Sequence, residues 1–157
     1  MVATKIRSVT KRLPDVRSWQ RQVERLDRIV FTGRRAVDGP FTKTMWQEIW
    51  TQPRFAIHVA YDVNQKIVGY LVTERTKPLK RYIVTLGVHP DHRGRGIARR
   101  LMQQMQRAQV NTISLHVAAT NIGAQEFYSN LGYSPTKRVR DYYARGDHAI
   151  YMQRHNL

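Results

Sequence analysis

The chain has 157 residues, of which 41% are hydrophobic and 24% are charged. This length suits one domain with a packed core, and the composition excludes a chain that is disordered throughout. No apolar run is long enough to cross a bilayer and no apolar segment follows Met1, so we expect neither a membrane span nor a secretory leader. The absence of cysteine excludes disulfide scaffolds, thiolate metal sites and cysteine nucleophiles, and it favours a cytoplasmic protein.

Positive charge is in large excess, with 27 Lys and Arg against 11 Asp and Glu and a net charge of +16. Such an excess attracts anions, which include nucleic acid, anionic cofactors and the surface of the ribosome. The net charge gives no information about the fold.

The spacing of apolar residues predicts a strand, two helices and a hairpin in the first half of the chain. The expected elements are a strand at 3–9 with Ile6 and Val9 buried, a helix from Pro14 and Asp15 to about Val30, a loop marked by Gly33, Gly39 and Pro40, a helix across Met45 to Trp50, and strands at 55–61 and 67–73. The first helix carries its apolar residues at helical spacing, namely Trp19, Val23, Leu26 and Val30. A second face of that helix carries Arg17, Arg21, Arg25 and Arg28.

The second half continues with alternating strands and helices. The expected elements are a basic loop at 77–81, a strand at 82–88, a glycine–arginine turn, a helix marked by Ala98, Leu101, Met105 and Ala108, a strand at 113–117, a helix at 121–130, and a closing hairpin from Tyr133 onward. The order is β-α-α-β-β-β-α-β-α-β-β, with no internal repeat and no linker. The sequence therefore predicts one mixed α/β domain over residues 1–157.

The turn between the strand at 82–88 and the following helix has the features of a phosphate site. The first amides of a helix lack partners within the helix, the helix dipole favours negative charge there, and glycine lets an anion approach the backbone. Arg93, Arg95, Arg99 and Arg100 add positive charge. The turn lacks the Gly-Lys-Ser/Thr of a nucleotide-triphosphate loop and the third glycine of a dinucleotide fingerprint. From spacing alone, an ordinary surface loop remains an equal alternative.

Two segments carry a family resemblance. The run Arg93-Gly94-Arg95-Gly96-Ile97-Ala98 is similar to the Arg/Gln-x-x-Gly-x-Gly/Ala signature of the GNAT superfamily of N-acetyltransferases, and the run from Asn121 to Tyr133 resembles its second conserved helix. The resemblance implies a central mixed sheet flanked by helices, with acetyl-CoA as cosubstrate and no metal. It implies that the cofactor contacts Leu86, Val88, Arg93, Gly94, Arg95, Gly96, Ile97, Ala98, Arg99, Asn121 and Tyr128, with the pyrophosphate on the 93–98 turn.

Three further stretches narrow the substrate. The runs at 82–87, 114–117 and 141–149 resemble those of protein N-terminal acetyltransferases, in particular the NatE-type catalytic subunit and the bacterial ribosomal-protein-alanine acetyltransferase. The resemblance implies that the substrate's first residues contact Phe31, Val84, Tyr142 and Tyr143. The segment 32–41 departs from that group, so the resemblance leaves the preference for the first residue open.

The chemistry of amine acetylation suits the residues available. Direct attack on a thioester needs a neutral amine, a base for its proton and an acid for the departing thiolate. A protein α-amine, with a pKa of roughly 7.7–8.0, is matched by a histidine near ~6.5. We expect His116 to act as base directly or through a water held by Tyr82, and Tyr128 to act as acid. Amides near Gly87 and Val88 suit the thioester carbonyl. With no cysteine and no serine in a nucleophile elbow, we expect no covalent intermediate.

Several alternatives stay open on sequence grounds. His116 is also compatible with a structural strand histidine, Tyr82 with the cap of a sheet edge, and Tyr128 with a core residue. Tyr142 and Tyr143 also suit an ordinary hairpin, and His89 and His92 are interpreted as loop residues rather than metal ligands.

Other functions also remain in play. The substrate alternatives are lysine side chains and small-molecule amines, and a third hypothesis is a non-catalytic module that binds CoA or RNA. The arginine stripe at Arg17, Arg21, Arg25 and Arg28 is the best candidate for a ribosome or RNA contact. With Glu24 and Asp27 within i,i+4 reach, it is equally typical of a solvated helix face.

Overall fold

The structure is a computed structural model that describes residues 4–10, 15–32, 39–106 and 109–156. Its elements follow the expected order, with one short 3-10 helix added. They are β1 (Lys5–Val9), α1 (Val16–Val30), α2 (Lys43–Thr51), β2 (Phe55–Tyr61), β3 (Ile67–Lys77), β4 (Lys80–Val88), the 3-10 helix η2 (Pro90–His92), α3 (Ile97–Gln106), β5 (Thr112–Ala118), α4 (Ile122–Ser129), β6 (Ser134–Ala144) and β7 (Asp147–His155). No helix within these ranges combines the length and the apolar character that a membrane span requires.

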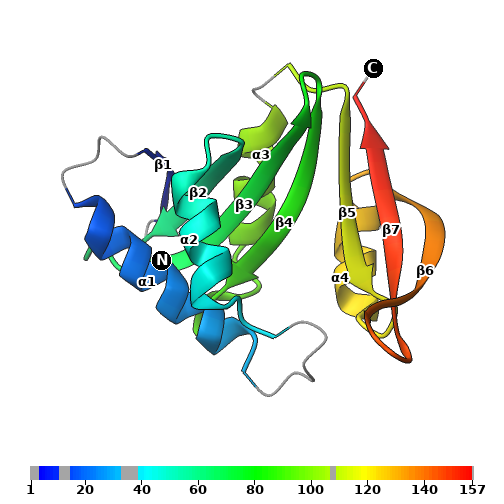
Figure 1. The fold of residues 1–157 in the computed structure, drawn as a ribbon. Coiled ribbons are helices and arrows are strands. Elements are labelled where there is room, and N and C mark those ends of the chain that lie inside the picture. Colours follow the sequence, from blue (N-terminus) through cyan, green and yellow to red (C-terminus); the bar gives the residue numbers. More distant parts are fainter. Residues whose placement is uncertain (1–3, 11–14, 33–38, 107–108, 157) are drawn as a thin grey trace.

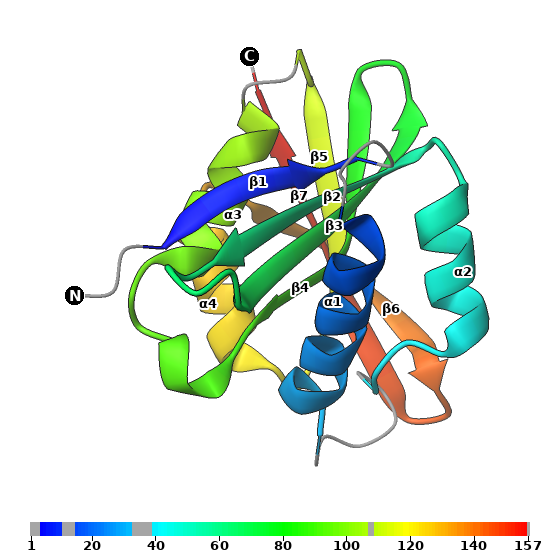
Figure 2. The same ribbon diagram turned by 90° about the vertical axis from the view of Figure 1, so that its left-hand side faces the viewer.

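The strands form one seven-stranded sheet in the order β1-β2-β3-β4-β5-β7-β6. Neighbouring strands are antiparallel except β4 and β5, which are parallel because α3 crosses over between them. Helices α1 and α2 cover one face of the sheet, and α3 and α4 cover the other (Figures 1 and 2). The expected mixed α/β architecture is confirmed.

Two apolar clusters hold the layers together, one on each face. The face under α1 and α2 buries the predicted helix positions Trp19, Val23, Leu26 and Val30 against β2 and β3. The opposite face packs α3 and α4 against β3, β4 and β5 and includes Leu101 and Met105. Strand β3 contributes to both clusters, and its residues 67–73 are all buried, as expected for a central strand covered on both faces.

The structure corrects several details of the sequence-based expectation. Residues 77–81 are not a loop, because β3 runs to Lys77 and β4 begins at Lys80, with Lys77 paired to Lys80 across the turn. Lys77 and Lys80 stay exposed at the end of a long hairpin, so the density of charge does not break the ladder. Ile6 and Val9 are half-buried rather than buried, since β1 is an edge strand. The expectations for Pro14, Gly33 and Ala108 lie outside the described residues.

The central strands separate where the parallel pair ends. Strands β4 and β5 are paired from Lys80 to Tyr82 and from Thr112 to Ser114. Beyond these positions, no β4–β5 pairing is recorded within the described residues, and Figure 1 shows the two strands diverging. The second half of β4 thus keeps β3 as its neighbour and has no neighbouring strand on its other side.

Candidate active site

A cavity of about 1140 Å³ lies where β4 and β5 diverge. It is lined by both strands, by α3, α4 and the turn before α3, by the segment that follows α1, and by the end of β6. It holds every residue that the sequence assigned to catalysis, cofactor or substrate, except Arg95. Because these residues come from across the whole chain, their convergence is a property of the fold rather than of any one motif.

The glycine–arginine turn forms one end of the cavity. Gly94 and Gly96 have φ angles of 71° and 72°, in the left-handed region that favours glycine, and the next residue begins α3. A Cβ built on either glycine meets no atom within 4 Å, so the space above this backbone is open. Open space, unpaired first-turn amides and nearby guanidinium groups suit a pyrophosphate.

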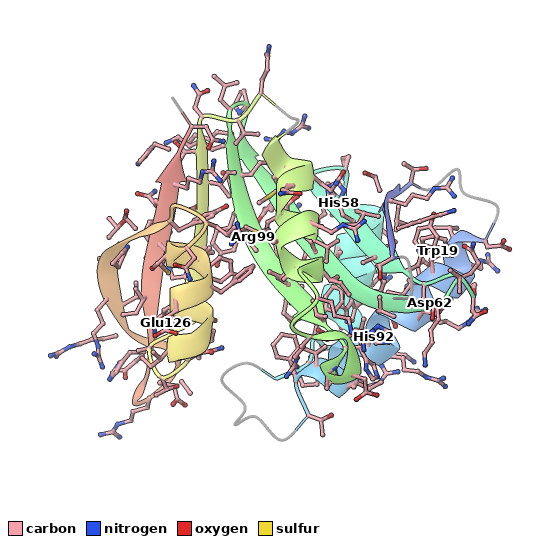
Figure 3. All side chains as sticks on the ribbon, turned by 180° about the vertical axis from the view of Figure 1, so that it is seen from behind. Trp19, His58, Asp62, His92, Arg99 and Glu126 are labelled. Atoms are coloured by element: carbon pink, nitrogen blue, oxygen red, sulfur yellow. The ribbon has the colours of Figure 1, made fainter. Side chains whose placement is uncertain are left out.

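The flanking residues of the turn take different roles. Arg93 lines the cavity while its Nε donates to the carbonyl oxygen of Val88 at 3.2 Å. Arg95 does not line it, and its Nη2 donates to the carbonyl oxygen of Asp91 at 3.0 Å. Arg99 extends from the first turn of α3 and is exposed (Figure 3). The predicted cofactor contact of Arg95 is therefore the least supported of this set. Ile97 and Ala98 also line the cavity.

The wall between the turn and the catalytic centre is built from β4 and α4. Leu86 and Val88 line it from β4, and Asn121 lines it from the start of α4, where its Oδ1 accepts from the Ala124 amide at 3.2 Å. Tyr128 lies on α4 with 8% of its surface exposed, and burial raises the pKa of its phenol. A neutral phenol at the cavity wall is a proton donor.

The two residues predicted to be catalytic, Tyr82 and His116, are in contact at the point where the strands separate. Tyr82 is the last β4 residue paired with β5, and His116 lies two residues beyond its partner Ser114, on the same side of the sheet. The Tyr82 hydroxyl lies 2.9 Å from His116 Nδ1 and 3.3 Å from the Tyr142 hydroxyl. The Tyr142 ring is stacked on the imidazole, with centroids 4.1 Å apart and planes at 11°.

The electrostatics of this cluster favour neutral side chains. Burial, and then the charge of Lys137, lower the pKa of His116 below the ordinary value of 6.5. Burial raises the pKa of Tyr82, and its contact with Tyr142 raises it further. His116 is consequently an unprotonated imidazole at neutral pH, the form that a general base requires.

The other end of the cavity is aromatic and apolar. The predicted substrate contacts Phe31, Val84, Tyr142 and Tyr143 all line it. Phe41, just before α2, and Met45, in its first turn, line it as well and were not identified from the sequence. No carboxylate belongs to this lining among the residues that the structure describes.

A buried carboxylate holds this end in place, and its position differs from the one expected from the sequence. Asp27 is not on the wet face of α1 but fully buried, where Oδ2 accepts from the Phe41 amide at 2.7 Å and Oδ1 accepts from the Tyr70 hydroxyl at 2.5 Å. Asp27 follows Val23 by four residues and so lies on the apolar face of the helix, and this spacing was the sequence signal for its burial. Nor does Glu24 pair with an arginine in the described contacts; it accepts from Trp50 Nε1 at 3.0 Å.

The known proteins to which this chain is similar are acetyltransferases. The family model described as acetyltransferase (GNAT) matches residues 19–133. An uncharacterized N-acetyltransferase of Methanocaldococcus jannaschii is 28% identical over 132 residues, covering 81% of this chain and 83% of that protein. N-alpha-acetyltransferase 30 of Schizosaccharomyces pombe is 31% identical over 120 residues, covering 71% and 79%. The solved ribosomal-protein-S18-alanine N-acetyltransferase of Escherichia coli has the same fold, with a TM-score of 0.79 at 18% identity, covering 98% of this chain and 94% of that one.

Proposed function

The chain belongs to the acetyltransferase (GNAT) family, and on that premise we propose that it transfers the acetyl group of acetyl-CoA to the α-amine of a protein N-terminus. The observation that carries the proposal is the contact of Tyr82, His116 and Tyr142. These three residues line the cavity between the glycine–arginine turn at one end and the aromatic residues at the other. The relatives support the same substrate class, since N-alpha-acetyltransferase 30 of Schizosaccharomyces pombe is among them.

In this mechanism the cosubstrate supplies a thioester whose carbonyl carbon accepts the amine. The N–C bond forms as the C–S bond breaks, so one proton must leave the nitrogen and one must reach the sulfur. His116 takes the first, directly or through a water, and Tyr128 supplies the second. The His89 amide donates to the carbonyl oxygen of Val68 on β3, so the Val88 amide points to the side of β4 that has no strand neighbour, where it suits the carbonyl oxygen of the thioester.

One of the two donor orders that these contacts permit gives the imidazole tautomer that this role needs. If His116 Nδ1–H donates to the Tyr82 oxygen, then Tyr82 O–H donates to the Tyr142 oxygen, and both recorded contacts are satisfied. Nε2 then keeps its lone pair for the substrate proton. The tyrosine hydroxyl orients the base, which is a second reason to expect Tyr82 to matter for turnover.

The lining argues against cationic small amines as substrates. A polyamine or an aminoglycoside needs carboxylates to hold its ammonium groups, and the described part of the cavity offers none. An N-terminal peptide instead needs apolar and aromatic contacts for its first residues, which Phe31, Met45 and Tyr143 provide.

A ribosome or RNA contact through α1 stays a prediction. Arg17, Arg21, Arg25 and Arg28 are all exposed on the face of α1 that points away from the sheet, and no recorded salt bridge in the described structure involves them. Four unpaired guanidinium groups along one helix face fit a phosphate backbone, and such binding weakens steeply as salt increases.

The deciding experiment is an acetylation assay with acetyl-CoA and short peptides varied at the first two residues, each with a free and with a blocked N-terminus. Product that disappears on blocking supports α-amine transfer. Product that survives blocking would assign the activity to lysine side chains, and no peptide product at all would leave small amines or a binding role.

Variants then test the assigned base. His116→Ala and Tyr82→Phe should lose turnover while keeping acetyl-CoA affinity. His58→Ala is the matched control, because His58 is also a partly buried strand histidine with a lowered pKa and a hydroxyl, Ser8 Oγ, 2.9 Å from Nδ1, yet it does not line the cavity. Full activity in the His116 and Tyr82 variants would refute the mechanism.

A further inference from the structure

We propose that Asp141 and His148 are positioning residues that lock the β6–β7 connection so that Tyr142 lies against His116. The proposal rests on the proposed function in one respect, that His116 is the group whose orientation matters. Neither Asp141 nor His148 lines the cavity, so both act through the tyrosine between them and the site.

The β6–β7 hairpin contains a large irregularity at this point. Val139 pairs with Ala149, but the next recorded pair is Ala144 with Asp147. Four residues of β6, 140–143, therefore lie opposite the single residue His148. A bulge of this kind leaves the strand ladder, so its backbone conformation must be fixed by contacts other than cross-strand pairing.

Asp141 adopts an unfavourable backbone conformation within the bulge. Its φ is 49°, and Asp141 and Gln65 are the two non-glycine residues with positive φ in the described structure. The left-handed conformation is unfavourable for a residue with a Cβ, although Asp and Asn tolerate it better than most. Specific hydrogen bonds must offset this cost.

Those bonds come from both ends of Asp141. Its amide donates to His148 Nδ1 at 3.0 Å, and its Oδ1 accepts from the Gly146 amide at 2.7 Å. The same Oδ1 lies 3.7 Å from His148 Nδ1. Asp141 thus links the bulge to β7 through its backbone amide and fixes the hairpin turn through its carboxylate.

Tyr142, the next residue in the chain, is the one whose position depends on this restraint. Tyr142 is 42% exposed, so burial alone holds its ring weakly. It nevertheless lies parallel to the His116 ring at 4.1 Å, with its hydroxyl 3.3 Å from Tyr82, and Tyr143 packs edge-on against it at 4.8 Å. An exposed ring keeps such a position only when the backbone that carries it is restrained. Asp141 and His148 supply the restraint, which fixes both the imidazole and the aromatic wall of the substrate end.

The experiment compares Asp141→Ala with Asp141→Asn. Alanine loses the acceptor and does not favour positive φ, whereas asparagine keeps an Oδ1 acceptor and tolerates the conformation. Asp141→Ala should raise the peptide KM about tenfold, the effect of one lost hydrogen bond, with acetyl-CoA affinity unchanged. Asp141→Asn should restore the KM. His148→Ala, which removes the acceptor for the Asp141 amide, should act in the same direction.

Asp62→Ala is the matched control. Asp62 Oδ1 also accepts two backbone amides at a hairpin turn, from Asn64 at 2.9 Å and from Lys66 at 3.0 Å, but it lies between β2 and β3, on the opposite side of the molecule from β6 and β7 (Figure 3). If loss of a turn carboxylate acted through general stability, Asp62→Ala would raise the peptide KM as much as Asp141→Ala does.

A readout without substrate separates this inference from the proposed function. The stacked Tyr142 ring shifts the NMR signal of the His116 ring protons upfield, and the signal can be assigned from its loss in His116→Gln. The shift should diminish in Asp141→Ala and His148→Ala and return in Asp141→Asn. An unchanged His116 signal in Asp141→Ala, or equal effects of alanine and asparagine, would overturn the inference. If no peptide is acetylated by any variant, the proposed function fails, and the NMR comparison still decides this one.

Discussion

Removal of the Asp27 carboxylate is the perturbation whose cost the structure defines best. In Asp27→Ala the Phe41 amide and the Tyr70 hydroxyl both lose their acceptor inside the protein. Tyr70 has no exposed surface, so water does not replace the lost partner without a local opening. A buried donor left without a partner costs about 1–3 kcal/mol, which applies to the Tyr70 hydroxyl, and the half-buried Phe41 amide adds less. This is a large share of the ~5–15 kcal/mol that stabilises a typical domain.

Urea unfolding followed by tryptophan fluorescence measures this cost, since the buried Trp46 packs against Tyr70 with ring centroids 6.1 Å apart. The double variant Asp27→Ala/Tyr70→Phe should be more stable than the sum of the two single changes implies, because the hydroxyl stranded by the first change is removed by the second. A cost below about 0.5 kcal/mol for Asp27→Ala, within the range of ordinary surface substitutions, would refute the reasoning.

The same carboxylate gives a pH dependence of defined sign. Burial raises the pKa of Asp27 above its ordinary value of 3.8. The folded state therefore keeps the proton to a higher pH than the unfolded state does. The stability linked to that proton is complete below pH 3.8 and is lost as pH rises through the folded-state pKa. Asp27→Asn cannot ionise, so its unfolding free energy relative to the unmodified protein should increase with pH across this window.

Two further predictions concern the catalytic strand and its base. The pH profile of kcat/KM for a peptide should have its lower inflection below the ordinary histidine pKa of 6.5, and Lys137→Met should move this inflection upward, since burial and then the charge of Lys137 lower the pKa of His116. An inflection unmoved by Lys137→Met would exclude the lysine as a cause. Gly87→Ala should cost about 1–3 kcal/mol in unfolding free energy, because its Cβ would lie 2.5 Å from a carbon of the buried Tyr70 ring, whereas Gly123→Ala, with nothing within 4 Å, serves as control.

The parts of the fold that the sequence predicted are those governed by local periodicity. The buried face of α1 follows from the spacing of Trp19, Val23, Leu26 and Val30, because a helix with four apolar residues on one side has one way to bury them. The same spacing places Asp27 on that face. Its burial was missed because its partners, Phe41 and Tyr70, lie 14 and 43 residues away, and no local pattern shows that a carboxylate will meet two donors.

The same distinction between local patterns and long-range contacts applies to the candidate site. The family signature pointed to the phosphate turn, to His116 and to the two tyrosines after Asp141, and the structure brings these residues to one cavity. The parallel contact of Tyr142 with His116 was beyond sequence reasoning, since it depends on a four-residue bulge and on one positive φ. Both are set by the register between β6 and β7, which a strand pattern leaves undefined.

Asp27 and Asp141 show how this basic chain uses its few acidic residues. Each accepts a backbone amide, from Phe41 in one case and Gly146 in the other, and each fixes a segment next to the substrate end of the cavity from outside. The described lining has no carboxylate to stabilise an ammonium, which favours binding of a neutral amine under the proposed function. At pH 7 neutralising an α-amine costs about 1 kcal/mol, whereas neutralising a lysine with a pKa of ~10.4 costs about 5 kcal/mol. This difference of about two and a half orders of magnitude in the reactive fraction is the physical reason to expect selection of N-termini over lysine side chains in this cavity.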